Sequence, residues 1–375
     1  MHTLAIFGTQ GDPVPPRSNA SMVVVDGVRV RCGLVDTPCP DFDAADSANA
    51  GKVLVRVTAV SCNYRDKAFF YAMQRVPYPR FTGVGSEFAG VVVAVGPDVH
   101  RLRVGDRVVC DQHYDGQLFH PNGVRQGVVA NQASRAYHVL PERKLQRIPP
   151  TMSDAAAAAF TLGAQTAYSM VRRAGVDSSS RVLVTAGGSN TSLFLLGAVR
   201  GTGASVTAST TSVRTAERLA ALGIHDVVLA ERTPGGRAGA EAIVAAAQER
   251  DGFDVVFDPF FDLHLLPAIQ ALRPGGRYVT CGFAGQNPNS AAAAGAEGTV
   301  PLVPMLAAVM QKNLSIIGNC IGLTSDLERA LHDFTAGRIA PVIDSVFTEA
   351  AAAQFFDRTY NDPDRFGKVV YRYDA

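Results

Sequence analysis

The sequence predicts a two-domain α/β protein in which a domain of short strands is joined to a doubly wound parallel sheet. Between residue 155 and about residue 323, strand-like and helix-like segments alternate, as they do when helices cover both faces of a parallel sheet. Before residue 154, short β-branched segments are separated by glycine and proline, which is typical of a partly open β-barrel. A length of 375 residues accommodates two such domains.

The first domain begins with glycine- and proline-rich residues 1–20, for which we expect a loose start. Residues 22–34 hold two β-type segments around a turn. Residues 52–60 form the strongest expected strand, because valines alternate with other residues along it. Further strands are expected at 91–95 and within 104–109, each next to a glycine-containing turn.

The second domain follows two prolines, and Ser153 is placed to cap the alanine-rich helix expected at 155–171. Helical periodicity is clear at 215–222 and 240–249, and one more helix is expected at 326–336, after the end of this domain. The strands of the parallel sheet are expected at residues 181–186, 204–208, 226–229, 253–258, 276–281 and 314–317.

The turn after the first of these strands is built from small or hydroxyl-bearing residues and leads into an apolar helix. A turn of this kind presents backbone N–H groups at a helix N-terminus, where a pyrophosphate binds. The alternative is a structural strand–helix turn that holds no ligand. The residues expected to bind the cofactor here are Gly187, Gly188, Ser189, Asn190, Thr191 and Ser192.

The end of the second strand of this sheet indicates which nucleotide binds. A site for NAD places Asp or Glu there to hold the ribose 2′-hydroxyl, and none stands between residues 203 and 216. The hydroxyls of Ser209, Thr210 and Thr211, with Arg214, suit the 2′-phosphate of NADPH instead. An ordinary helix cap at Ser212 with a solvated Arg214 is compatible with the same residues.

Composition excludes several classes of protein. Charged residues make up 18% of the chain and the net charge is +1, so we expect neither a nucleic acid nor a membrane surface as partner. The six cysteines contain no C-x-x-C pair and are typical of reduced thiols in a cytoplasmic protein. The sequence shows no signal peptide and no apolar run of membrane-spanning length.

Four spaced motifs carry a family resemblance. They are Val-Leu-Val-Arg-Val at 53–57, Asn-Tyr-Arg-Asp at 63–66, Gly-x-Glu-x-x-Gly at 85–90 and Val-Gly-Asp-Arg-Val at 104–108. In this order, and with the turn at 187–192, they make residues 22–375 resemble the medium-chain dehydrogenase/reductase superfamily. The chain is most similar to its zinc-free quinone oxidoreductase and enoyl reductase branch, although Ser-Asn-Thr-Ser at 189–192 replaces the usual Gly-Gly-x-Gly.

The resemblance implies a GroES-like partly open β-barrel as catalytic domain, formed by residues 1–154 and completed by residues 324–375. It implies a Rossmann doubly wound parallel sheet as NADPH-binding domain, formed by residues 155–323. It also implies a homodimer, in which edge strands at 314–317 pair, and a small-molecule substrate. The uncharged and mostly apolar strand at 314–317 is a poor solvent-facing edge, which favours the same conclusion.

The resemblance also implies roles for single residues. In zinc-free reductases the loop matching residues 63–66 lines the cleft near the nicotinamide, so the Tyr64 hydroxyl and the Asn63 amide are expected to polarise a substrate carbonyl. The structural alternative is an Asx-type turn from Asn63 and Asp66 with Tyr64 packed in the protein. Further positions expected to bind the cofactor are Thr166, Cys281, Gly282, Phe283, Asn319 and Lys368.

A zinc site is not expected. Zinc alcohol dehydrogenases place a cysteine where Cys62 stands and a His-Glu pair where this chain has Ser86 and Glu87. Catalytic zinc needs about three protein ligands. The histidines at 113, 120 and 138 are not placed by any motif.

Three functions are compatible with these observations. The first is a zinc-independent, NADPH-dependent reductase of an activated double bond in a quinone, enone or enoyl thioester. The second is a zinc-type alcohol dehydrogenase. The third is a family member that binds the nucleotide without redox turnover.

Overall fold

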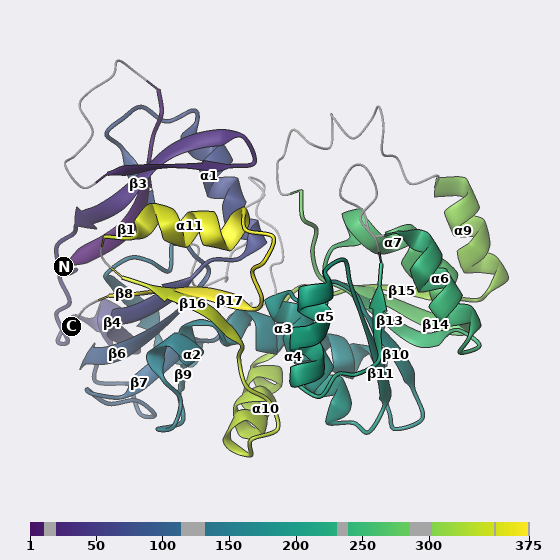
Figure 1. The fold of residues 1–375 in the computed structure, drawn as a ribbon. Coiled ribbons are helices and arrows are strands. Elements are labelled where there is room, and N and C mark those ends of the chain that lie inside the picture. Colours follow the sequence, from purple (N-terminus) through teal and green to yellow (C-terminus); the bar gives the residue numbers. More distant parts are fainter. Residues whose placement is uncertain (11–19, 114–131, 231–238, 286–301, 349, 374–375) are drawn as a thin grey trace. The chain divides into compact units, whose positions relative to one another are not determined.

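The structure, a computed structural model, describes residues 1–10, 20–113, 132–230, 239–285, 302–348 and 350–373. Contacts divide the chain into two compact units, Met1–Leu162 with Pro341–Ala375, and Gly163–Ala340. Both termini therefore belong to the first unit (Figure 1). Within the described parts of the chain, no helix has the length and apolar composition needed to cross a membrane.

The second unit contains a six-stranded sheet in the order β12-β11-β10-β13-β14-β15, and every neighbouring pair is parallel. This order confirms the predicted doubly wound sheet, because the chain starts in the middle and extends to both edges. Its strands are β10 (Arg181–Val184), β11 (Ser205–Thr210), β12 (Val227–Leu229), β13 (Phe253–Asp258), β14 (Leu272–Thr280) and β15 (Ser315–Gly318).

Helices alternate with these strands, as Figure 1 shows. They are α4 (Asn190–Arg200), α5 (Val213–Ala221), α6 (Ala240–Gln248), α7 (Phe261–Ala271), α9 (Leu302–Gln311) and α10 (Thr324–Thr335), preceded by α3 (Thr161–Ala174). Apolar residues of α6, α7 and α9 form one core with Leu183, Val256 and Tyr278 of the strands. Because side chains alternate along β10, Val182 and Val184, which are also fully buried, face the opposite side of the sheet from Leu183.

Helix α10 belongs to the second unit, whereas the boundaries expected from the sequence placed it in the first domain. The reason is a pair of polar contacts with α3. Arg172 Nε lies 2.8 Å from Asp326 Oδ1, and the Tyr168 hydroxyl donates to Asp333 Oδ2 at 2.6 Å. The second unit runs from Gly163 to Ala340, whereas the expected domain runs from 155 to 323.

The first unit contains a four-stranded sheet in the order β2-β3-β1-β5. Its strands are β1 (His2–Phe7), β2 (Ser21–Val25), β3 (Val28–Asp36) and β5 (Phe81–Gly83). The expectation of a loose start is wrong for β1, whose residues 4–7 are completely buried against the unit's interior. The proline-rich residues that suggested a loose start fall on 11–19, outside the described residues.

A second sheet in this unit runs β16-β17-β4-β6-β7-β9, with β8 also paired to β4. The described strands do not close into a barrel, in agreement with the expected partly open form. Its strands are β4 (Lys52–Ser61), β6 (Glu87–Val95), β7 (Arg107–Cys110), β8 (Tyr137–Pro141), β9 (Leu145–Arg147), β16 (Ile343–Phe347) and β17 (Lys368–Arg372).

Short helices connect these strands. They are η1 (Ser47–Asn49), η2 (Tyr64–Asp66), η3 (Glu142–Lys144), α1 (Lys67–Met73) and α2 (Asp154–Ala158). The expected cap is present, since Ser153 Oγ accepts a hydrogen bond from Ala156 N at 3.2 Å.

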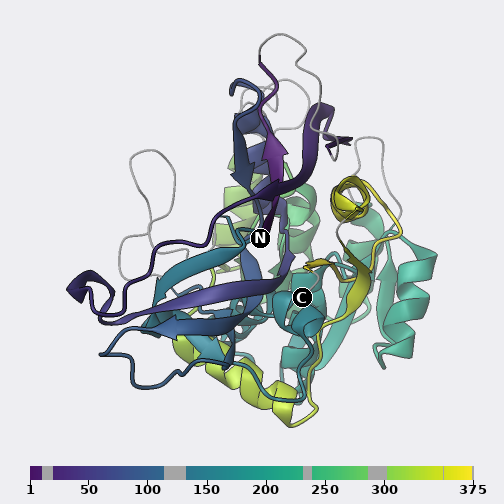
Figure 2. The same cartoon turned by 90° about the vertical axis from the view of Figure 1, so that its left-hand side faces the viewer.

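Helix α11 (Ala352–Tyr360) was not expected from the sequence. In two perpendicular views it lies between the N-terminal strands and the pair β16–β17 (Figures 1 and 2). Phe355 and Phe356 are completely buried, and their rings pack edge-on against Tyr371 and Phe70 respectively. The helix therefore supplies core to both sheets, which anchors the C-terminal segment in the first unit.

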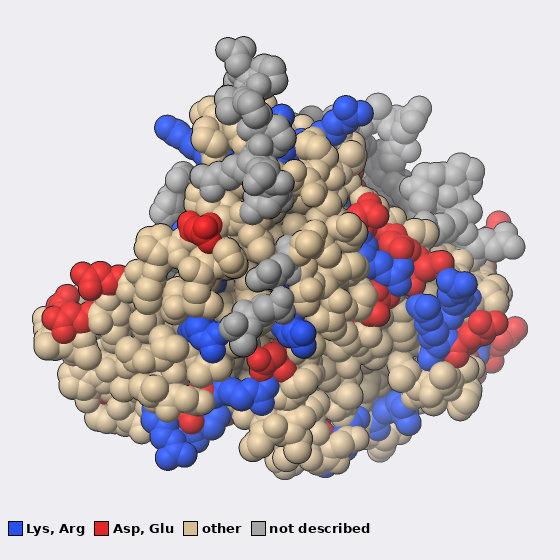
Figure 3. All heavy atoms as spheres, turned by 60° about the vertical axis from the view of Figure 1, so that its left-hand side comes forward, with Lys and Arg blue, Asp and Glu red and all other residues tan. Residues whose placement is uncertain are grey.

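Charged residues of both signs are scattered in small groups over the face shown in Figure 3. All six cysteines are free thiols.

Candidate active site

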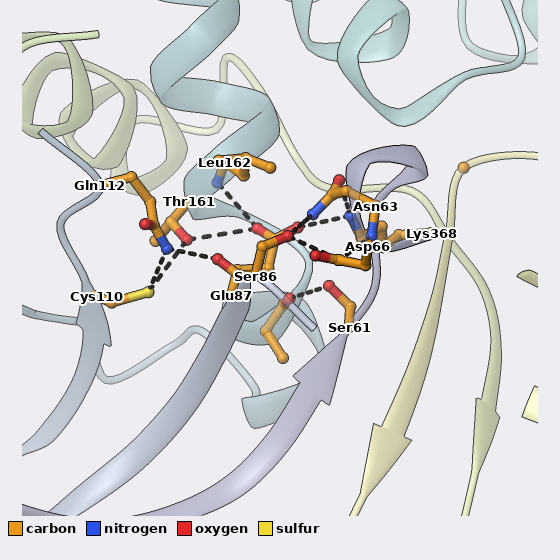
Figure 4. A network of polar contacts seen from close by, with 12 residues as sticks. Ser61, Asn63, Asp66, Ser86, Glu87, Cys110, Gln112, Thr161, Leu162 and Lys368 are labelled. Carbon is orange, nitrogen blue, oxygen red and sulfur yellow. Dashed lines mark hydrogen bonds and ion pairs between the residues drawn. The ribbon is translucent and has the colours of Figure 1, made fainter. Parts of the chain in front are cut away.

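A buried polar network in the first unit joins three strand ends (Figure 4). Strand β4 ends at Ser61, which is paired with Glu87 at the start of β6 and with Val370 near the start of β17. Because β4 runs antiparallel to both neighbours, its last residues meet their first residues. The side chains that follow β4 therefore meet Glu87 and Lys368, which are far apart in the sequence.

Gly85 brings the start of β6 close to the end of β4. It has a φ of +87°, and a Cβ at this position would lie 2.8 Å from Val60 Cγ2 and 2.9 Å from Ser61 O. Only glycine adopts this conformation and tolerates this approach at little cost. Gly85, the first glycine of the Gly-x-Glu-x-x-Gly motif, thus allows β6 to begin close to the end of β4. The two residues that follow it, Ser86 and Glu87, are completely buried.

The centre of the network is an ion pair between Lys368 and Glu87. Lys368 Nζ lies 2.6 Å from Glu87 Oε1, and the side chains are 3% and 0% exposed. The other carboxylate oxygen, Oε2, accepts hydrogen bonds from Leu162 N at 2.9 Å and Thr161 Oγ1 at 3.4 Å. A buried charge is tolerated only when it is paired and hydrogen-bonded, and Glu87 meets both conditions.

The Asn63 amide is held on both sides. Its Oδ1 accepts from Lys368 Nζ at 2.6 Å, while Nδ2 donates to Ser86 Oγ at 2.9 Å and Glu87 Oε1 at 3.0 Å. Lysine only donates, so Oδ1 must be the atom that faces it, which fixes the orientation of the amide. Both amide hydrogens are therefore used inside the network and neither is directed to a substrate.

Asp66 closes the network at the loop that follows β4. Its Oδ2 accepts from Asn63 N at 2.7 Å and from Ser86 Oγ at 2.8 Å, which holds residues 63–66 in a tight turn. The Oδ1 atom has no hydrogen-bond partner among the described residues. Burial raises the pKa of the Asp66 carboxyl above its usual value.

Tyr64 lies in this loop, on η2, and is partly buried. Lys67 Nζ lies 4.7 Å from the centre of its ring, and the guanidinium carbon of Arg365 lies 5.8 Å from it. Two cations therefore flank the aromatic ring. The Lys67 ammonium is itself balanced by Asp26, whose Oδ2 lies 2.8 Å away, so these contacts hold the ring in place.

The residues at this site do not fit a catalytic zinc ion. Zinc requires thiolate, neutral imidazole or carboxylate ligands. Cys62 is buried, and burial with the nearby Asp66 raises the pKa of its thiol well above the usual range, which disfavours the thiolate. Ser86 is not a zinc ligand of this type, and Glu87 already binds an ammonium.

The described residues also contain no group of three His, Cys, Asp or Glu side chains arranged to hold a metal ion. His138 is stacked on Phe88 at 4.9 Å, and burial lowers its pKa to about 4, so it is a neutral packing residue. His113 adjoins the segment 114–131, and His120 lies within that segment, outside the described residues.

In the second unit, the predicted nucleotide turn connects β10 to α4. Gly187 N donates to Ser209 O at 2.8 Å, so the turn packs on the end of β11. A Cβ at Gly187 would lie 2.9 Å from Leu219 Cδ1, which explains the glycine. Ser189 has extended backbone angles (φ −76°, ψ 150°), so serine replaces a glycine there without strain.

Hydroxyl groups order this turn. Ser189 Oγ accepts from Ser192 N at 3.2 Å and caps α4, and Ser192 Oγ donates to Thr185 O at 2.7 Å. Thr185 Oγ1 in turn donates to the buried Asp258 at 2.7 Å. The first turn of α4, where Asn190 and Thr191 lie, is thereby fixed relative to the strand ends.

Asp258 was missed by sequence reasoning, although it ends a predicted strand. Its carboxylate also accepts from the Tyr278 hydroxyl at 2.7 Å and Phe260 N at 3.0 Å, and it contacts His264 Nδ1 at 3.0 Å. These groups come from α7, β14 and the loop after β13, which no local pattern brings together. The hydrogen bonds to His264 and Tyr278 oppose the burial and hold the pKa of Asp258 below its usual value.

The end of β11 presents the residues predicted to hold a 2′-phosphate. Ser209 and Thr210 are buried at the end of the strand, and Thr211 is partly exposed. Ser212 Oγ accepts from Thr215 N at 3.3 Å and caps α5, and Arg214 is exposed in the first turn of that helix. A helix N-terminus with an exposed arginine is suited to a phosphate.

The remaining predicted cofactor residues fall on both units. Cys281, Gly282 and Phe283 follow β14, and the ring of Phe283 lies 5.6 Å from that of Phe261. Asn319, after β15, accepts from Ser169 Oγ at 2.9 Å. Thr166 is buried on α3.

Lys368 lies in the first unit, where its ammonium binds Glu87 and Asn63. In the second unit the predicted residues other than Thr166 follow the carboxyl ends of strands, and the first unit gathers Asn63, Tyr64 and Lys368.

Two family models match the chain. The alcohol dehydrogenase GroES-like domain matches residues 49–150, and the zinc-binding dehydrogenase model matches residues 192–336.

Relatives include a zinc-type alcohol dehydrogenase-like protein of Schizosaccharomyces pombe, 26% identical over 347 residues, 89% of this chain and 94% of the relative. An erythronolide synthase of Saccharopolyspora erythraea is 34% identical over 190 residues, 50% of this chain and 5% of the relative. A spectinabilin polyketide synthase system protein of Streptomyces orinoci is 32% identical over 275 residues, 73% of this chain and 11% of the relative. The chain thus spans nearly the whole yeast relative but only a small part of the synthases.

Solved structures share the fold. An NAD-dependent alcohol dehydrogenase superposes with a TM-score of 0.75 at 26% identity, covering 99% of both chains. A crotonyl-CoA carboxylase/reductase in complex with NADP superposes with a TM-score of 0.73 at 19% identity, covering 99% of this chain and 94% of the other. The second likeness concerns the fold alone.

Proposed function

Because this chain belongs to the medium-chain dehydrogenase/reductase superfamily of oxidoreductases, we propose that it transfers hydride from NADPH to an activated double bond without catalytic zinc. The substrate class is a quinone, an enone or an enoyl thioester. The observation that supports the proposal most is the buried ion pair between the Lys368 ammonium and the Glu87 carboxylate, because this carboxylate is then not available to bind zinc.

Hydride transfer itself belongs to the cofactor, so the protein has two tasks. It holds the acceptor carbon close to the nicotinamide, and it stabilises the oxyanion that develops on the substrate carbonyl. We assign the second task to the Tyr64 hydroxyl. Asn63 holds the loop in place, because both of its amide hydrogens are already donated to Ser86 and Glu87.

The site is less suited to a zinc-type alcohol dehydrogenase, which the name of the yeast relative suggests. In such an enzyme the metal polarises the substrate oxygen, and about three protein ligands must hold it. Of the three positions that could supply ligands, Cys62, Ser86 and Glu87, the second is a serine, which is not a zinc ligand of this type. The third, Glu87, is paired with Lys368.

Metal analysis tests this proposal. We expect the purified protein to contain no stoichiometric zinc, and we expect a chelator to leave its NADPH oxidation with quinone, enone and enoyl thioester acceptors unchanged. One zinc ion per chain, removed by the chelator together with the activity, would contradict the proposal. NADPH binding without turnover of any acceptor would favour a non-catalytic nucleotide-binding protein instead.

We also expect NADPH to bind more tightly than NADH. The end of β11 carries hydroxyls and Arg214 where an acidic residue would be needed to favour NADH. One hydrogen bond between an arginine and a phosphate is worth roughly 1.5–3 kcal/mol, which corresponds to about tenfold to a hundredfold in affinity.

Measuring the dissociation constants of NADPH and NADH checks the expected preference. Arg214→Ala is expected to weaken NADPH selectively, and Arg200→Ala, at the other end of the neighbouring helix, serves as control. Equal affinities for the two nucleotides in the parent would refute it.

We further propose a homodimer formed through β15. This strand is at the edge of the sheet, and Ile316 is 46% exposed. An exposed apolar edge strand is a ready surface for pairing with a second copy. Light scattering is expected to give twice the chain mass of 39.6 kDa, and Ile316→Lys is expected to give the monomer. Val104→Lys, at an exposed apolar position of the first unit that is 62% exposed, is expected to leave the dimer intact. A monomeric parent at micromolar concentration would exclude this assembly.

A further inference from the structure

We propose that the Lys368 ammonium is the built-in cation of this site and that it excludes a metal ion from the ligand positions at Cys62, Ser86 and Glu87. The inference rests on the proposed zinc-independent function and adds the residue responsible for it. It differs from the simpler explanation, in which the serine at position 86 alone prevents zinc binding.

The first support is that Glu87 has no capacity left for a metal. A carboxylate offers about four acceptor positions on its two oxygens. Oε1 receives Lys368 Nζ at 2.6 Å and Asn63 Nδ2 at 3.0 Å. Oε2 receives Leu162 N at 2.9 Å and Thr161 Oγ1 at 3.4 Å. A metal ion therefore has to displace a protein donor before Glu87 becomes a ligand.

The second support is electrostatic. Glu87 is completely buried, and a buried carboxylate requires a compensating positive charge. Lys368 supplies one unit of charge in direct contact, so a divalent ion would bring excess positive charge next to an ammonium. Lys368 thus already supplies the positive charge that a metal ion would otherwise bring to the buried carboxylate of Glu87.

The third support is the way in which the fold holds Lys368. It is the first residue of β17, and its backbone N donates to Val342 O at 2.9 Å, so the stem of the side chain starts from a fixed point. The ammonium also donates to Asn63 Oδ1, which ties it to the loop that carries Tyr64. The lysine is therefore a positioning residue as well as a counter-charge. The chain therefore holds a fixed internal cation at the carboxylate of Glu87.

The experiment restores the missing ligand with and without the lysine. Full-length parent, Ser86→His, and Ser86→His combined with Lys368→Met are loaded with zinc, dialysed and analysed for metal. Cobalt is added in parallel, because the visible spectrum of bound cobalt reports its ligand geometry. We expect stoichiometric metal only in the combined variant, and none in the parent or in Ser86→His.

Two further variants keep the test decisive if Lys368→Met fails to fold. Ser86→His with Lys368→Arg keeps the positive charge and is expected to bind no metal. Ser86→His with Lys368→Gln keeps a donor for Asn63 but removes the charge, and is expected to bind one ion per chain. Circular dichroism and a cooperative urea unfolding transition establish that each variant is folded.

Stoichiometric zinc in Ser86→His alone would overturn the inference, since the lysine would then exclude nothing. A folded, charge-free variant without metal would overturn it as well. Neither result affects the proposed reductase function, which depends on turnover by the metal-free parent. Conversely, zinc-dependent turnover in the parent would refute the proposed function directly.

Discussion

Replacing Lys368 by methionine is expected to lower the free energy of unfolding by about 3–5 kcal/mol, because it leaves a buried carboxylate without its partner. Glu87 is 0% exposed, so water cannot take the place of the ammonium without rearrangement. Urea unfolding measured by circular dichroism or tyrosine fluorescence checks this, since the chain contains no tryptophan.

The neutral double variant distinguishes the ion pair from lost packing. Removing both charges, in Lys368→Met with Glu87→Gln, is expected to recover most of the stability, because no unpaired charge remains. Lys52→Met, at the start of β4, is a matched control and is expected to change stability by less than about 0.5 kcal/mol. Equal losses in the single and double variants would show that the pair contributes packing and not charge compensation.

Tyr64→Phe is expected to reduce turnover by about 10²–10³-fold, which is the usual effect of removing one donor to a developing oxyanion. The affinity for NADPH is expected to stay within a few-fold, because the change removes one hydroxyl from a loop of the first unit. Steady-state kinetics and nucleotide titration measure both quantities.

Two further variants separate catalysis from structure. Tyr137→Phe, on β8, is a control that is expected to retain turnover. Asn63→Ala removes the bond to Lys368 and is expected to lower both stability and turnover. If Tyr64→Phe retains more than about a tenth of the turnover, Tyr64 is a packing residue and another group supports the oxyanion.

The parallel sheet could be predicted from the sequence because each strand is a short buried run between turn residues. All six expected strands are present, and β13 has the predicted bounds. The N-cap at Ser153 was equally local, since a hydroxyl before an alanine-rich segment is sufficient to indicate it. These features depend on residues that are neighbours in the chain.

The ion pair could not be predicted in the same way. The sequence relates Lys368 only to the cofactor and Glu87 only to the ligand positions of a zinc site. Their contact depends on β4 pairing with both β6 and β17, which is a property of the assembled sheet. The Asp258 network is similar, because it joins β10, β13, β14 and α7. Helix α11 was missed because its short alanine and phenylalanine pattern does not distinguish a buried helix from a strand.

The turn at 189–192 shows that serine can take the place of glycine where the backbone does not require a positive φ. The turn keeps glycine at 187, where a Cβ would meet Leu219, and it uses serine at 189, where the backbone is extended. Ser189 then caps α4 with its own side chain. The hydroxyl stabilises the helix start that must bind the pyrophosphate if the nucleotide binds here.

The most direct test of the proposed chemistry follows the hydride itself. Chelator-treated protein is incubated with NADPH that carries deuterium on one or the other face of C4 of the nicotinamide, and with an enone or an enoyl thioester, whose products keep the transferred atom on carbon. A quinone is assayed by the primary isotope effect on NADPH oxidation, because the hydroxyl hydrogens of its product exchange with water. The mass of each product is then measured. We predict that one acceptor gains one deuterium from a single face of the nicotinamide, in protein that contains no zinc. No deuterium in the enone or enoyl thioester product from either labelled face together with no isotope effect with the quinone, or transfer that appears only after zinc is added back, would contradict the account.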